Sequence, residues 1–215
     1  MRLFTYYRLL MLEKLKIRAD GDSVLDVGCY DGDLISFQPA RKKFAVDLDI
    51  EGRNDNVIYV KADGINLPFK DNIFEHVFAI EVIEHVEDEK RFISQLCRVT
   101  KPGGEIILTT PNKNIRLFPW FITNWVSKKW GHVKIGYTTD ELFTLFPTEG
   151  YQMKSLKLRE LCYRNFYIPV KLSWDFFYRI SQNIGKAIIK IIIYFDCLFL
   201  EGEKGHLLFI IKKLT

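Results

Sequence analysis

The stretch of sequence that decides the fold is VLDVGCYDGDL, residues 24–34. It opens with an apolar run, and Gly28 and Gly32 follow where a helix is expected to begin. An apolar run that ends in glycine is typical of a buried strand that turns sharply into a helix. Glycine lets the backbone pass close to a ligand, and the free N–H groups of a helix start face that ligand. The stretch therefore predicts a ligand-binding turn between a strand and a helix.

The turn has two alternative interpretations, a site for a different cofactor and a turn without any ligand. A nicotinamide dinucleotide site would read G-x-G-x-x-G, whereas Gly28 and Gly32 give only G-x-x-x-G, so this cofactor is the weaker expectation. A turn that binds nothing is the other alternative for an isolated glycine pair. Tyr30 stands between the glycines, and a positive φ at that position would strain its backbone.

Two further apolar runs end in an acidic residue. Residues 44–47 end at Asp47, about 20 residues past the first glycine, and residues 57–64 include Asp63. A carboxylate at the end of a parallel strand can accept hydrogen bonds from both hydroxyls of a ribose, and such bonds are strong because the acceptor is charged. Asp49 competes with Asp47 for this role.

These residues resemble class I S-adenosylmethionine-dependent methyltransferases, whose loop has the pattern acidic-x-Gly-x-Gly-x-Gly. Asp26, Gly28 and Gly32 match that pattern, and Tyr30 replaces the middle glycine. The chain resembles the family as far as Asn112. The matching segments after the loop are LPF at 67–69, HVFAI at 76–80, EVIEHV at 81–86, a helix at 88–99, KPGG at 101–104 as a turn, and a strand at 105–110.

The resemblance and the alternation of strands and helices imply an α/β fold. It is expected to be a Rossmann-like doubly wound sheet with helices on both faces, mostly parallel with an antiparallel last strand, plus a helical lid. Residues 205–213 should pair antiparallel with the strand near 151–158 at the sheet edge, and an amphipathic helix within residues 1–16 should cover the sheet. A single domain is expected over residues 1–215, with acceptor-side inserts at about 113–136 and 160–200.

The resemblance also implies the cofactor, S-adenosylmethionine, and the residues around it. Asp47 is expected at the ribose and Asp63 with Gly64 at the adenine. His85 is the expected catalytic proton acceptor, since an imidazole titrates near neutral pH. The alternative is a purely structural role, in which His85 holds the loop after the strand in place. The expected cofactor contacts are Asp26, Gly28, Cys29, Tyr30, Asp31, Gly32, Asp47, Leu48, Ala62, Asp63, Gly64, Ile80 and Glu81.

A metal site is an alternative rather than an expectation. The E-x-x-E-H spacing of Glu81, Glu84 and His85, together with His132, is similar to that of metal-dependent polyprenyl-quinone and small-RNA 2′-O-methyltransferases. Two carboxylates and imidazoles suit a divalent ion that lowers the pKa of an acceptor hydroxyl. The same residue types could equally be the ones that are common at the start of a helix, with no metal bound.

The first insert is rich in aromatic residues and precedes a helix at 137–142, for which Thr138 or Thr139 is the expected N-cap. The aromatic side chains could form the wall of an acceptor pocket, or they could pack a lid helix onto the domain. They are Phe118, Trp120, Phe121, Trp125 and Trp130.

Within the second insert, residues 174–200 are almost entirely apolar or aromatic and predict one long helix with a narrow polar line. Its charges are too frequent for a membrane span. Burial within the fold or in a homodimer, a lid over an apolar acceptor, and peripheral membrane contact remain open. The polar line consists of Asp175, Arg179, Asn183, Lys186, Lys190, Cys197 and Glu201.

Composition limits the class of protein, the partners and the cellular location that are expected. Hydrophobic residues make up 48% of the chain, which is typical of a globular protein, and the formal net charge is only +4. Charged residues form no basic block, so no nucleic-acid partner is expected. The four cysteines (Cys29, Cys97, Cys162 and Cys197) are far apart and no secretory leader is recognised. Reduced thiols and a cytoplasmic location are therefore expected, with membrane association as an option.

The predicted activity is transfer of a methyl group to an oxygen, or to a nitrogen, of a small or lipid-linked acceptor by in-line displacement. The rival hypothesis is a non-catalytic S-adenosylmethionine-binding or partner subunit on the same fold.

Overall fold

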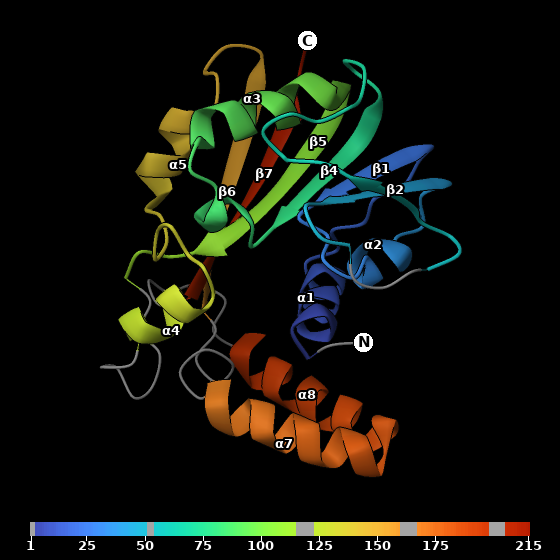
Figure 1. Ribbon diagram of the computed structural model, residues 1–215, viewed down its shortest axis with the longest axis vertical. Coiled ribbons are helices and arrows are strands. Elements are labelled where there is room, and N and C mark those ends of the chain that lie inside the picture. The colour runs from blue at the N-terminus through green and yellow to red at the C-terminus, as the bar shows by residue number, and fades with distance from the viewer. Residues whose placement is uncertain (1–2, 51–53, 115–122, 160–166, 198–204) are drawn as a thin grey trace.

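A computed structural model describes residues 3–50, 54–114, 123–159, 167–197 and 205–215. Its centre is a seven-stranded sheet in the order β3-β2-β1-β4-β5-β7-β6 (Figure 1). The strands are β1 (Ser23–Val27), β2 (Lys42–Asp47), β3 (Ile58–Lys61), β4 (Phe74–Ile80), β5 (Thr100–Pro111), β6 (Tyr151–Arg159) and β7 (Gly205–Lys213).

The strand directions confirm the predicted doubly wound sheet with an antiparallel last strand. Strands β3, β2, β1, β4 and β5 pair in parallel, and β7 is antiparallel to both β5 and β6. Because β7 lies between β5 and β6, the edge of the sheet on this side is β6, and β3 forms the other edge. This position suits the sequence of β7, whose residues 205–209 are all buried.

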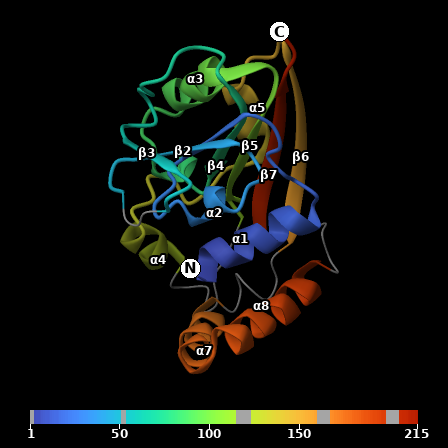
Figure 2. The same cartoon turned by 90° about the vertical axis from the view of Figure 1, so that its right-hand side faces the viewer.

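Helices cover both faces of the sheet (Figure 2). On one face, Tyr7 of α1 packs with Val24 and Phe78; on the other, Phe92 of α3 packs with Leu25. Neighbouring residues of β1 thus point to opposite faces, as the two-residue period of a strand requires. The helices are α1 (Leu3–Lys14), α2 (Asp33–Ser36), α3 (Glu89–Val99), α4 (Thr123–Lys129), α5 (Thr139–Leu145), α7 (Tyr167–Ile180) and α8 (Gln182–Cys197), with a 3-10 turn η1 (Ile83–His85).

Two helix starts follow directly from local sequence. The side chain of Asp88 accepts a hydrogen bond from the Arg91 amide at 3.0 Å and caps α3. The Thr138 hydroxyl and the Glu141 carboxylate form a reciprocal capping box at the start of α5. The prediction of an N-cap at Thr138 or Thr139 is therefore confirmed, with Thr138 as the cap.

The turn predicted at residues 101–104 is wrong, because these residues lie within β5. Helix α3 does end at Val99, but the chain continues as strand. The register against β4 shifts between Phe74 and His76, and Gly103 takes a φ of +80°. The glycine permits an irregularity in the strand instead of a separate turn.

The single long helix predicted for residues 174–200 is also wrong. The chain forms two helices, α7 and α8, which separate at Ser181. Gly185 lies so close to α7 that an added Cβ would be 3.1 Å from Tyr178 Cα. Close packing between the two helices thus overrides the continuous helical pattern. No helix in the described ranges combines the length and the apolar character that crossing a membrane requires.

Candidate functional site

The turn after β1 adopts the strained geometry that the sequence suggested. Gly28 and Gly32 have φ values of +79° and +70°, and Tyr30 has a φ of +53°. The Tyr30 amide donates a hydrogen bond of 2.7 Å to Oδ2 of Asp47 at the end of β2. The carboxylate therefore holds the tyrosine in the left-handed region, which few non-glycine residues adopt. Helix α2 after this turn has only four residues.

Two adjoining cavities lie at the carboxyl ends of the strands. The first, of about 670 Å³, we call the β2–β3 cavity; it is lined by Asp47, Leu48, Ala62, Asp63 and Gly64 among others. The second, of about 440 Å³, we call the α1 cavity; it is lined by Phe4, Thr5, Asp26, Cys29, Asp31, Ile80 and Trp130 among others. Gly28, Tyr30, Glu81 and His85 line both cavities.

The predicted contact residues therefore meet at one rim of the sheet, divided between two compartments. Asp47 and Asp63 face the β2–β3 cavity, and Asp26 faces the α1 cavity. Gly32 is the predicted contact that lines neither cavity; a Cβ there would be 2.5 Å from Tyr59 Oη. This glycine is required by the packing of Tyr59 beneath the loop.

The carboxyl group of Asp26 is strongly perturbed by its surroundings. Its side chain is buried on the α1 face of β1. Burial, together with the smaller effect of the negative charges of Asp47 and Asp31, raises the pKa of Asp26 to about 7. A cationic ligand group in the α1 cavity would favour the ionised carboxylate. Burial likewise raises the pKa of the Cys29 thiol, which makes this free thiol a poor nucleophile.

Glu81 is held by a buried polar network that the sequence analysis did not anticipate. It follows β4 with a φ of +55°. Its carboxylate accepts one hydrogen bond from the Thr109 hydroxyl at 2.8 Å and lies 2.6 Å from His206 Nε2 and 3.7 Å from Arg8 Nη2. Arg8 Nη2 also lies 3.0 Å from His206 Nδ1. Arg8 and His206 are 198 residues apart in sequence, so only the fold reveals their proximity.

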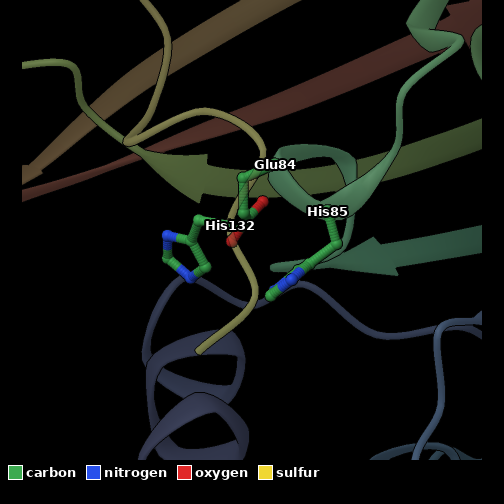
Figure 3. Close-up of side chains that lie close together, drawn as sticks. All are labelled: Glu84, His85 and His132. Carbon is green, nitrogen blue, oxygen red and sulfur yellow. The ribbon is translucent and has the colours of Figure 1, made fainter. Parts of the chain in front are cut away.

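A second cluster consists of Glu84, His85 and His132 (Figure 3). One potential ligand atom from each residue lies within 4.8 Å of the others, and the two imidazole rings are nearly perpendicular with centroids 4.7 Å apart. Oε2 of the buried Glu84 accepts a hydrogen bond from Thr110 at 3.0 Å. Of the four groups considered in the sequence as metal ligands, three come together. Glu81 is not part of this cluster, because Arg8 and His206 hold its carboxylate.

Backbone hydrogen bonds fix the segment that carries His132. The Glu84 carbonyl accepts from the amides of Val133 at 2.9 Å and Lys134 at 3.2 Å. The hydroxyl of Tyr137 donates to the Ile83 carbonyl at 3.1 Å. These bonds attach the segment after α4 to η1 and place His132 beside His85.

The predicted aromatic pocket wall is only partly described. Trp130 lines the α1 cavity, whereas Trp125 is largely exposed to solvent. Phe118, Trp120 and Phe121 lie outside the described residues. Cys162 also lies outside them, as does the side chain of Cys197; Cys97 is a free, buried thiol.

Comparison with known proteins agrees with this architecture. Residues 25–108 match the family model described as a methyltransferase domain. Norajmaline N-methyltransferase from Rauvolfia serpentina is 33% identical over 101 residues, which cover 40% of this chain and 35% of that protein. The ubiquinone biosynthesis O-methyltransferase of Rickettsia conorii is 29% identical over 197 residues, which cover 81% of this chain and 61% of that protein. The chain thus spans less than two thirds of either relative.

A solved structure shows the same fold. The Haemonchus contortus phosphoethanolamine N-methyltransferase 2, in complex with phosphomonomethylethanolamine and S-adenosylhomocysteine, gives a TM-score of 0.62 at 17% identity, over 96% of this chain and 52% of that chain. Residues 25–108 thus match the S-adenosylmethionine-dependent methyltransferase family in sequence, and the sheet has the class I fold of these enzymes. The cofactor of this family is S-adenosylmethionine.

Proposed function

We propose that this chain transfers the methyl group of S-adenosylmethionine to an oxygen, or to a nitrogen, of a small or lipid-linked acceptor. The observation that carries the proposal is the pair of adjoining cavities, which share Gly28, Tyr30, Glu81 and His85. In this proposal the adenosine occupies the β2–β3 cavity, with the ribose hydroxyls on Asp47 and the adenine near Asp63 and Gly64. The cationic methionine portion and the acceptor occupy the α1 cavity.

The chemistry is an in-line displacement. A lone pair of the acceptor forms a bond to the methyl carbon, the carbon–sulfur bond breaks, and its electron pair remains on sulfur as a neutral thioether. The enzyme supplies alignment and exclusion of water. An acceptor hydroxyl also loses a proton, and a nearby base can take it.

His85 is the proposed base. Its Nδ1 lies 3.2 Å from the Gly131 carbonyl oxygen, which can only accept a hydrogen bond. A proton on Nδ1 therefore leaves Nε2 unprotonated. A base beside the acceptor space favours oxygen, and the Rickettsia conorii relative is an O-methyltransferase.

The direct test is turnover with a panel of hydroxyl and amine acceptors of matched size, including prenylated ones. Formation of S-adenosylhomocysteine is measured by mass spectrometry. We expect product with at least one hydroxyl acceptor. If the protein binds S-adenosylhomocysteine yet turns over none of the panel, the non-catalytic subunit becomes the better account.

A second candidate role for Glu84, His85 and His132 is a divalent cation site. Two imidazoles and a carboxylate form a donor set that suits Zn²⁺ or another first-row ion. The contacts of Glu84 with Thr110 and of His85 with Gly131 resemble the outer hydrogen bonds that orient metal ligands. Such an ion would act as a Lewis acid that lowers the pKa of the acceptor hydroxyl.

Two alanine variants separate a base from a metal site. If His85 is the base, His85→Ala lowers kcat by about 100-fold, with unchanged affinity for S-adenosylhomocysteine. His132→Ala then lowers kcat much less, because His132 does not take the proton. Equal losses in both variants, together with loss of activity in chelator and its recovery with one added ion, would instead support the cation site.

Asp26 makes cofactor binding dependent on pH. With a pKa of about 7, the carboxyl is mostly neutral at pH 6 and mostly ionised at pH 8. The ionised form attracts the sulfonium, so we expect S-adenosylmethionine to bind about tenfold more weakly at pH 6 than at pH 8. Calorimetric titration across this range measures the effect. Asp26→Asn should bind weakly at pH 8 and show little pH dependence; an unchanged pH profile in that variant would remove Asp26 from the explanation.

A further inference from the structure

Helices α7 and α8 each bury one side against α1, beneath the body of the protein (Figures 1 and 2). Trp174 of α7 and Ile189 and Ile193 of α8 join the apolar cluster that contains Tyr6 and Met11 of α1. The Trp174 and Tyr6 rings are 5.8 Å apart. No described residue of α7 or α8 lines the α1 cavity or the β2–β3 cavity. Their position therefore does not support the predicted lid over the acceptor.

The opposite side of α8 is apolar although it faces solvent. Ile184, Ala187, Ile191 and Tyr194 follow one another at intervals of three, four and three residues, which places them along one stripe of a helix. Ile191 and Tyr194 are 59% and 60% exposed. A solvent-facing stripe of a helix normally carries polar residues.

Helix α7 repeats this arrangement with Leu172, Phe176 and Ile180, which are spaced four residues apart and are 61–65% exposed. Since both helices bury their other sides in the same cluster, the two stripes face away from it. At the end of the α8 stripe, the Tyr194 ring also contacts α1, since Lys14 Nζ lies 5.9 Å from its centroid. We call these seven residues, from Leu172 to Tyr194, the apolar face. Apolar patches of this kind on a protein surface mark interaction sites.

Cationic residues flank the apolar face. Lys171 is paired with Asp175 at 2.7 Å. Arg179 and Lys190 are exposed. Lys186 lies on the other side of α8, where it lines a cavity with Tyr6 and Glu13 of α1. From Tyr167 to Cys197 the sequence contains four Lys or Arg residues and two Asp residues, so the pair of helices has a positive net charge.

We propose that α7 and α8 seat the protein on an anionic phospholipid surface, with the apolar face inserted at the level of the acyl chain boundary. An exposed apolar stripe beside lysine and arginine is the pattern of helices that lie in a membrane interface, and anionic headgroups attract the flanking cations. A second copy of the chain fits less well. A two-fold interface places the same patch on both subunits, and this would bring Arg179 and Lys190 near their own copies.

The test is sedimentation of the full chain with vesicles of phosphatidylcholine containing 0% or 30% phosphatidylglycerol. We expect binding to the anionic vesicles, at least tenfold weaker binding to the neutral ones, and partial release in 0.5 M salt. Phe176→Glu with Ile191→Glu should lower the partition coefficient at least tenfold. Arg179→Gln with Lys190→Gln should reduce the preference for anionic vesicles while retaining weak binding to both kinds.

The matched control is Leu214→Glu with Ile58→Glu, which adds the same two charges at exposed apolar residues outside these helices and should leave vesicle binding unchanged. Circular dichroism and thermal melting verify that all variants fold. Failure of the folded wild-type chain to sediment with anionic vesicles at millimolar lipid would overturn the proposal. So would a stable dimer in analytical ultracentrifugation that Phe176→Glu with Ile191→Glu dissociates.

Discussion

Replacing Asp47 with alanine is expected to weaken binding of S-adenosylhomocysteine about 100-fold. Hydrogen bonds to a charged group contribute about 1.5–3 kcal/mol each, and one carboxylate that accepts from both ribose hydroxyls would contribute about 3 kcal/mol in all. The variant also loses the acceptor for the Tyr30 amide, which Asp47 binds at 2.7 Å. Loosening of the loop therefore adds to the loss. Calorimetry at pH 8 provides the affinity.

Two further variants show how much of the lost affinity comes from the hydrogen bonds between Asp47 and the ribose. Asp47→Asn retains an oxygen acceptor for Tyr30 but removes the charge, so it should have an intermediate affinity. Asp49→Ala removes the neighbouring carboxylate, which is exposed and 3.3 Å from Lys61 Nζ, and should change the affinity less than threefold. A large effect at Asp49 with none at Asp47 would reverse the two assignments.

Gly28→Ala is expected to lower both the thermal stability and the cofactor affinity, and Gly103→Ala is its matched control. The two glycines have nearly the same φ, +79° and +80°, so left-handed strain of about 1–2 kcal/mol is common to both variants. A Cβ at position 28 would lie 2.5 Å from Val82 Cγ2, whereas at position 103 nothing lies within 4 Å. The contact should add about 1–3 kcal/mol, which lowers Tm by about 5 °C more than in the control.

Gly28 also lines both cavities, so Gly28→Ala should weaken binding of S-adenosylhomocysteine at least tenfold while Gly103→Ala leaves it unchanged. Adding Val82→Ala to Gly28→Ala should recover part of the excess loss of stability, since it removes the contacting methyl groups. Equal melting temperatures for Gly28→Ala and Gly103→Ala would contradict the prediction, because they would show that Val82 moves aside at no cost in stability.

The sequence predicted the central part of the fold because its signals there are local. Apolar runs that end in Asp47 or near Asp63 mark buried parallel strands, and parallel strands bring their carboxyl ends to one rim. The positive φ of Tyr30 was also foreseeable, since it replaces a glycine of the family loop. The expected rim is present, and twelve of the thirteen predicted cofactor contacts line one of its two cavities.

The features that the sequence did not reveal depend on distant contacts. Arg8 and His206 lie near opposite ends of the chain, and only the folded arrangement of α1 and β7 brings them to Glu81, the residue after β4. The separation of α7 from α8 depends on Gly185 packing against Tyr178. The periodicity of apolar residues predicted a helix that continues through Ser181, because this pattern contains no information about contacts between two helices.

The central claim is that the rim formed by Gly28, Tyr30, Asp47 and Asp63 holds an adenosyl amino acid cofactor. Calorimetric titration of the wild-type chain at pH 8 with S-adenosylhomocysteine, and separately with NAD, tests it most directly. The account predicts saturable binding of one S-adenosylhomocysteine per chain and no measurable binding of NAD at the same concentration. Tighter binding of NAD, or no binding of either compound by a folded sample, would contradict it.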